Sequence, residues 1–179
     1  KSDDLLTNYI QFLKINSTKK SKYNLARIYA RKSYMIAMDY FWKVDFFETM
    51  NNKQVVAEKI LNNFNNAISI NPEDNAYQLY QIGSLYTEVL KLEVRGRNYI
   101  EKAISTYLNK SKLNADDYFY LAYSYSLTNN YEKAEKYFDK ILTLSDDNIF
   151  YYEWISNYYI SKKEYLKALN LLEKITSIC

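Results

Sequence analysis

The residue types that carry most enzyme chemistry are scarce in this chain of 179 residues. It has no histidine, the commonest general base and metal ligand, and its single cysteine is Cys179. It also lacks the glycine-rich phosphate loop, the G-x-S-x-G nucleophile motif and any metal-type cysteine spacing. Three pairs of adjacent carboxylates stand where helices are expected to begin, where they favour exposed backbone N–H groups: Asp3-Asp4, Asp116-Asp117 and Asp146-Asp147. The sequence therefore predicts no enzyme, no cofactor and no metal site.

Aromatic side chains are the chemistry that the sequence does offer. There are 21 tyrosines, 8 phenylalanines and 2 tryptophans. Two interpretations stay open. The rings replace Leu and Phe in the protein interior, or some of them line a surface that binds a partner. Tyrosine and tryptophan suit the second role because they offer a large contact area at a low entropic cost.

Helical hairpins are the elements expected to position these rings. Two Gly and one Pro are too few for many tight turns, so the chain is expected to be almost wholly helical. The pattern of residues 115–148 recurs in residues 149–179 with a period of 34, which predicts stacked units that bury their apolar faces against their neighbours. The shift pairs Tyr118 with Tyr152, Leu121 with Ile155, Tyr125 with Tyr159, Ala134 with Ala168, Phe138 with Leu172 and Ile141 with Ile175.

This pattern resembles the tetratricopeptide repeat. In that family a large residue, a Leu/Gly-type pair and a tyrosine mark the first helix of a unit. Tyr118, Leu121-Ala122 and Tyr125 fill these places, and Ala134 and Phe138 fill the alanine and aromatic places of the second helix. The resemblance implies an all-α fold, in which tandem antiparallel helical hairpins stack into a right-handed solenoid with one or two extra N-terminal helices.

The pattern continues less regularly toward the N-terminus. Residues 76–114 are expected to form an irregular repeat with a lengthened first helix, a turn at Arg95-Gly96-Arg97 and a second helix whose apolar positions reach Leu113. Residues 52–75 are expected to supply the second helix and closing turn of a degenerate repeat. Residues 1–51 are expected to be N-terminal helices, and either one long helix over 22–50 or a further hairpin fits that stretch.

The resemblance also implies a binding groove, because in the family the first helix of each hairpin lines a concave surface. Members that clamp a chaperone's C-terminal carboxylate use groove lysines. Phe119 and Glu153 stand where such lysines would be needed, so this chain is not expected to act as a clamp. The groove-facing positions fall on Tyr77, Tyr80, Ser84 and Thr87, on Phe119 and Tyr123, and on Phe150 and Asn157.

Together the repeats and the missing catalytic groups predict a protein–protein interaction scaffold or adaptor that binds a partner segment in this groove. The terminal helix is a second candidate interface, because no polar capping helix follows it. Self-association through that helix would instead make the chain a structural dimerisation module. The apolar residues concerned are Leu171, Leu172, Ile175 and Ile178.

Charge and hydropathy narrow the range of partners. The net charge is only +3, and Lys and Glu are interspersed, so a nucleic-acid-binding surface is disfavoured. The alternative to a protein partner is single-stranded RNA, whose bases would stack on the aromatic rings. No apolar run approaches the roughly 20 residues of a membrane span. The chain begins with Lys1 and not with Met, so two compartments stay open. They are the cytoplasm and, if a missing N-terminal segment carries a signal or lipid anchor, the cell envelope.

Overall fold

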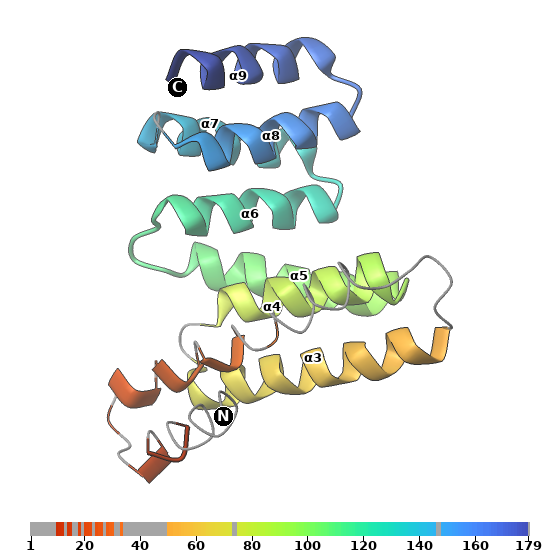
Figure 1. The fold of residues 1–179 in the computed structure, drawn as a ribbon, viewed down its shortest axis with the longest axis vertical. Helices are drawn as coiled ribbons and strands as arrows, with labels where there is room; N and C mark the ends of the chain where they lie inside the picture. Colours follow the sequence, from red (N-terminus) through yellow and green to blue (C-terminus); the bar gives the residue numbers. More distant parts are fainter. Residues whose placement is uncertain are drawn as a thin grey trace. The chain divides into compact units, whose positions relative to one another are not determined.

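The computed structural model describes residues 10–12, 14–15, 18, 20–22, 24–26, 28–30, 33, 50–72, 75–145 and 148–178, and all regular structure in these ranges is helical. The chain divides into two compact units, Lys1–Leu108 and Asn109–Cys179. None of the described helices combines the length and apolar character that crossing a membrane requires. The elements (Figure 1) are α3 (Met50–Ile70), α4 (Ala76–Ser84), the π-helix η1 (Leu85–Val89), α5 (Glu93–Leu108), α6 (Ala115–Leu127), α7 (Tyr131–Leu144), α8 (Ile149–Ser161) and α9 (Tyr165–Ile178).

In the first unit, α3, α4 and α5 run alternately back and forth (Figure 1). Ser33 is fully buried and donates a hydrogen bond to the carbonyl oxygen of Ile60 at 3.3 Å, which joins the N-terminal helical residues to α3. The choice between one helix over 22–50 and a hairpin depends on residues outside the described ranges. One cluster of the buried core of this unit is formed by Ala30, Ala57, Ile60, Phe64, Ile82 and Leu85.

The turn between α4 and α5 lies earlier in the chain than the sequence indicated. The helix that begins at Ala76 continues as η1 through Val89, and α5 already begins at Glu93. The predicted turn at Arg95-Gly96-Arg97 is therefore wrong, because these residues lie inside α5. Leu113 likewise lies beyond the end of α5 and not on it.

Close packing between α4, η1 and α5 explains why a glycine occurs inside a helix here. A Cβ on Gly96 would lie 2.8 Å from the carbonyl oxygen of Gly83 and 2.0 Å from Oγ1 of Thr87. A Cβ on Gly83 would lie 2.5 Å from Cδ1 of Ile100. Only the missing side chains let the helices approach this closely. Gly83 therefore packs against α5, and Gly96 marks the same packing and not a turn.

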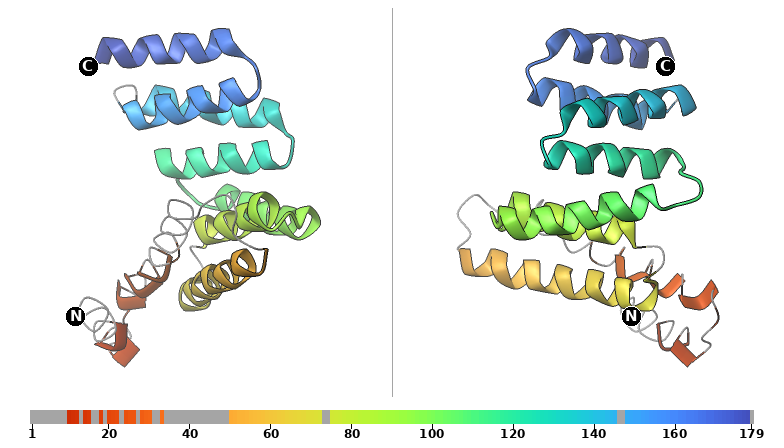
Figure 2. Two further views of the ribbon diagram at one scale, coloured as in Figure 1. Left: turned by 45° about the vertical axis from the view of Figure 1, so that its right-hand side comes forward. Right: turned by 180° about the vertical axis from the view of Figure 1, so that it is seen from behind.

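In the second unit, α6 to α9 run alternately in opposite directions as two consecutive hairpins (Figures 1 and 2). Their first helices begin at Ala115 and Ile149, the residues at which the 34-residue pattern starts. The side chain of Asn114 accepts a hydrogen bond from the backbone N–H of Asp117, and the Asp117 carboxylate accepts one from the N–H of Asn114. This reciprocal cap fixes the start of α6. The pairs Asp3-Asp4 and Asp146-Asp147 lie outside the described residues.

The internal turns of the two hairpins have the same backbone conformation. Asn129 and Lys163 both have a φ of 62°, in the left-handed region, and they are related by the repeat shift. Asparagine tolerates this region better than lysine does. The two turns are therefore alike in geometry and differ in how well their sequences suit that geometry.

Candidate partner-binding face

A cluster of aromatic rings joins α6 to α8 in the second unit. The ring of Phe119 lies with its centroid 5.6 Å from that of Phe150, 5.6 Å from that of Tyr151 and 6.2 Å from that of Trp154. Tyr123 adds contacts to Phe119 at 4.8 Å and to Trp154 at 6.4 Å. Because Phe119 is only 5% exposed, it lies beneath the surface and supports the rings above it.

Two hydrogen bonds fix α8 against α6 beside this cluster. The hydroxyl of Tyr123 donates to the carbonyl oxygen of Trp154 at 2.9 Å, and the hydroxyl of Tyr151 donates to Oδ1 of Asp116 at 2.6 Å. Burial raises the pKa of Tyr151, and its hydrogen bond to the Asp116 carboxylate raises it further. The phenol is therefore a neutral donor at physiological pH, and it orders the helix that carries the exposed rings.

Four residues of α8 form an exposed stripe above the cluster. Phe150, Glu153, Trp154 and Asn157 follow the spacing i, i+3, i+4, i+7, which places them on one side of the helix. Phe150 and Trp154 are each 47% exposed, with ring centroids 5.8 Å apart. We call this stripe, together with Phe119 and Tyr123 beneath it, the aromatic face.

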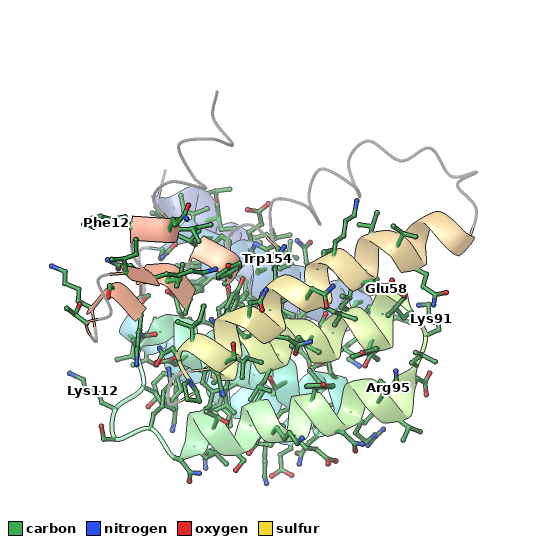
Figure 3. The ribbon with its side chains drawn as sticks, turned by 90° about the horizontal axis from the view of Figure 1, so that it is seen from below. Phe12, Glu58, Lys91, Arg95, Lys112 and Trp154 are labelled. Atoms are coloured by element: carbon green, nitrogen blue, oxygen red, sulfur yellow. The ribbon has the colours of Figure 1, made fainter. Side chains whose placement is uncertain are left out.

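The structure brings together the predicted site residues of the second unit. Phe119, Tyr123, Phe150 and Asn157 all belong to the aromatic face. Trp154, labelled in Figure 3, is as exposed as Phe150, but sequence reasoning missed it because it falls outside the groove-facing positions of the resembled family. Its i, i+4 spacing from Phe150 was a signal that could have found it.

The predicted residues of the first unit lie on α4 and η1, where Tyr77, Ser84 and Thr87 contact other residues of that unit. Tyr77 packs against the core around α3, and Tyr80 is half-buried. The hydroxyl of Ser84 donates to the carboxylate of Glu88, and Thr87 lies against the backbone of α5 at Gly96. These contacts give three of the four side chains a role inside the first unit.

A surface depression of about 610 Å³ lies at the turn that leads into α5, where Figure 3 labels Lys91 and Arg95. A single short segment lines it, and none of the predicted site residues is included. In the described ranges, no three histidine, cysteine or carboxylate side chains gather as metal ligands would. The depression is lined by Lys91, Leu92, Glu93, Val94, Arg95 and Asn98.

The predicted terminal interface is only partly exposed. Leu172 is 40% exposed, whereas Leu171, Ile175 and Ile178 are half-buried on the inner side of α9. The sequence missed the most exposed apolar side chains of α9, because the repeat pattern drew attention to the inward positions. These side chains are Tyr165 at 63%, Leu166 at 80% and Leu169 at 50%.

Helices α6 and α7 form an antiparallel hairpin (Figure 1). The same stretch, residues 115–148, matches the model of the family described as tetratricopeptide repeat. Residues 115–148 form a tetratricopeptide repeat. The resemblance that the sequence suggested is thereby confirmed for this hairpin. Comparison with curated proteins gives no match.

Among solved structures, the fold is similar to that titled "Crystal structure of MamA", with 16% identity, coverage of 98% of this chain and 87% of that chain, and a TM-score of 0.51. Another match is "MamA 41-end from Desulfovibrio magneticus RS-1", with 14% identity, coverage of 98% and 93%, and a TM-score of 0.48. At such identities the first match shows a shared fold alone. The tetratricopeptide repeat of residues 115–148 supports a scaffold for protein–protein interaction in general terms.

Proposed function

We propose that the protein is a non-catalytic scaffold that binds a segment of a partner protein on the aromatic face. The observation that carries the proposal is the pair Phe150 and Trp154, each 47% exposed and packed on each other. Exposed aromatic side chains that sit on a well-packed base are typical anchors of protein interfaces. The repeat architecture of residues 115–148 supports the same role.

The rings are held in place before a partner arrives. Phe119 packs beneath them, and the two inter-helix hydrogen bonds from Tyr123 and Tyr151 fix the helix that carries them. Preorganisation lowers the entropic cost of binding. Covering the exposed halves of both rings would contribute on the order of 3 kcal/mol to the free energy of binding, before entropic costs are subtracted. Together with backbone and polar contacts, this is enough to select a partner.

The test compares two pairs of substitutions in affinity capture from the native cell. Phe150→Ser with Trp154→Ser removes the exposed rings, and Leu166→Ser with Leu169→Ser removes a comparable apolar surface from α9. All four side chains are at least 47% exposed, so both variants are expected to fold, which circular dichroism checks. We expect the captured partner to be lost with the first variant and retained with the second. Retention by the first variant would overturn the proposal. Loss with the second alone would instead assign binding to α9.

A further inference from the structure

The two helices that carry the aromatic face have no basic residue. α6 and α8 contain three carboxylates, Asp116, Asp117 and Glu153, and neither helix contains a lysine or an arginine. Their partner helices differ in this respect, because α7 and α9 both contain lysines. The lysines of the helices in this unit are therefore confined to the second helix of each hairpin, and the first helices present acidic and aromatic groups.

Of these three carboxylates, one has a cationic partner and two have none among the described residues. Asp117 is neutralised by an ion pair with Lys110 at 2.9 Å. The partner of Asp116 is the neutral phenol of Tyr151, which does not cancel its charge. Glu153 is exposed between Phe150 and Trp154 on the stripe, and among the described residues no ion pair to it is found. Two carboxylates thus remain beside the exposed rings.

The nearest lysines along the chain lie in the turns. Lys162 follows α8, and its ammonium group lies 3.5 Å from the centroid of the Tyr131 ring, at the start of α7. Lys112 and Lys163 are exposed in the turns before α6 and after α8. These groups stand in the turns, whereas the stripe from Phe150 to Asn157 lies on α8 itself, from its second to its ninth residue.

We propose that the aromatic face selects a basic partner segment, in which a lysine or arginine stands next to a large apolar side chain. This inference rests on the proposed function and specifies the partner. The apolar side chain packs on Phe150 and Trp154, and the cationic group reaches Glu153 and Asp116. The cationic group is also attracted to the faces of the exposed aromatic rings, and this cation–π attraction is strongest for tryptophan. Acidic segments and nucleic-acid phosphates meet two carboxylates that have no cationic partner among the described residues, and they are disfavoured.

The test is selection from a displayed library of random peptides on the intact chain, followed by titration of synthetic peptides. We expect selected peptides to be rich in Lys or Arg beside Leu, Phe or Trp. Replacing the basic residue of a selected peptide by Gln should weaken binding about fivefold, and replacing it by Glu should weaken it more than tenfold. Raised salt should weaken the basic peptides and leave their Gln versions nearly unchanged.

Glu153→Lys provides the matched variant. It keeps Phe150 and Trp154 in place and reverses one charge, so binding of the basic peptides should fall about tenfold and the Glu versions should gain affinity. Glu132→Lys on α7 makes the same charge change away from the face and should leave the preference unchanged.

Three other outcomes overturn the inference, and they differ in what they say about the proposed function. Peptides that need Phe150 and Trp154 but show no charge preference would leave the proposed function standing and remove only the basic selectivity. Enrichment of acidic peptides would reverse the stated partner class. If no peptide is selected, or if single-stranded RNA binds at that face where peptides do not, the proposed function fails as well.

Discussion

The two hairpins of the second unit share one sequence pattern but differ in how much of it is buried. Ala134 and Phe138 of α7 are both fully buried. Their repeat partners on α9 are Ala168, 2% exposed, and Leu172, 40% exposed. The alanines, which face the other helix of their own hairpin, are alike, whereas the larger residues differ.

Contacts with the following hairpin account for this difference. Phe138 of α7 lies 5.3 Å from the Tyr123 ring of its own hairpin and 4.8 Å from the Tyr158 ring of α8. Leu172 lies on α9, which packs against α8 of its own hairpin. Nothing in the described part of the chain lies on the other side of α9 (Figure 1). A repeat pattern therefore predicts helices, while neighbouring repeats determine which residues become core.

The largest expected effect tests this comparison directly. Phe138→Ala should lower the free energy of unfolding by about 4 kcal/mol, because it leaves a cavity in a fully packed site. Leu172→Ala, at the matching position of α9, should cost only about 1 kcal/mol because the side chain is already 40% exposed. Urea unfolding followed by circular dichroism measures both. Equal costs would show that α9 is covered in solution.

The hairpin of the first unit extends the comparison to the small residues that let paired helices approach. Gly96→Ala should destabilise the protein by about 2 kcal/mol, because its Cβ would meet backbone atoms of Gly83 and Thr87 that cannot move aside. Gly83→Ala should cost less, about 1 kcal/mol, because its nearest contacts are side-chain atoms of Ile100 and its backbone contact, the carbonyl oxygen of Gly96, lies at 3.0 Å. Thermal unfolding of both variants ranks their stabilities. The reverse order would mean that the paired helices do not approach each other most closely at Gly96.

Alkaline pH should weaken the second unit through the tyrosines of α8. Burial raises the pKa of Tyr158 and of Tyr159 to about 12, whereas an unfolded tyrosine titrates near about 10. The unfolded state therefore releases these protons first, and the free energy of unfolding is unaffected well below pH 10 and falls as pH rises from about 10 to about 12. Urea midpoints across this range measure the loss. Tyr158→Phe should make the decline shallower, and an unchanged slope would contradict this assignment.

The smallest effect concerns the two turns that share a φ of 62°. Lys163→Asn should raise the free energy of unfolding by about 0.5–1 kcal/mol, since asparagine adopts this conformation at a lower cost. Asn129→Lys should lower it by somewhat more, because the swap also removes the hydrogen bond that Asn129 accepts from the Tyr131 hydroxyl. Chemical denaturation of both variants provides the comparison. A destabilised Lys163→Asn variant would show that the lysine is not strained there.

The sequence predicted the fold best where local and repeated signals agree. The 34-residue shift located α6 and α8, and the acidic pair at Asp116-Asp117 marked a helix start, because periodicity and capping act within a few residues of chain. Gly96 was misread because the physical reason for it, close contact with Gly83, depends on a second helix. Local sequence contains no information of that kind.

The candidate site shows the same division. The repeat positions pointed to Phe119, Tyr123 and Phe150, which do form one cluster with α8. They did not separate buried from exposed rings, so Phe119 was expected on the surface and Trp154 was missed. The exposure of Phe119 and Trp154 depends on which of the two rings lies outermost, and the packing between α6 and α8 determines this.

Site-specific photo-cross-linking in the native cell tests the aromatic face most directly. A photoreactive phenylalanine at Asn157 lies on the exposed stripe and leaves Phe150 and Trp154 intact, and the same group at Glu132 of α7 is the control. The account predicts a discrete cross-linked protein from position 157 and none from position 132, with the attached segment identified by mass spectrometry. Cross-linking at position 132 but not at position 157 would contradict the account. So would the absence of any product from position 157 in cells that express the substituted protein.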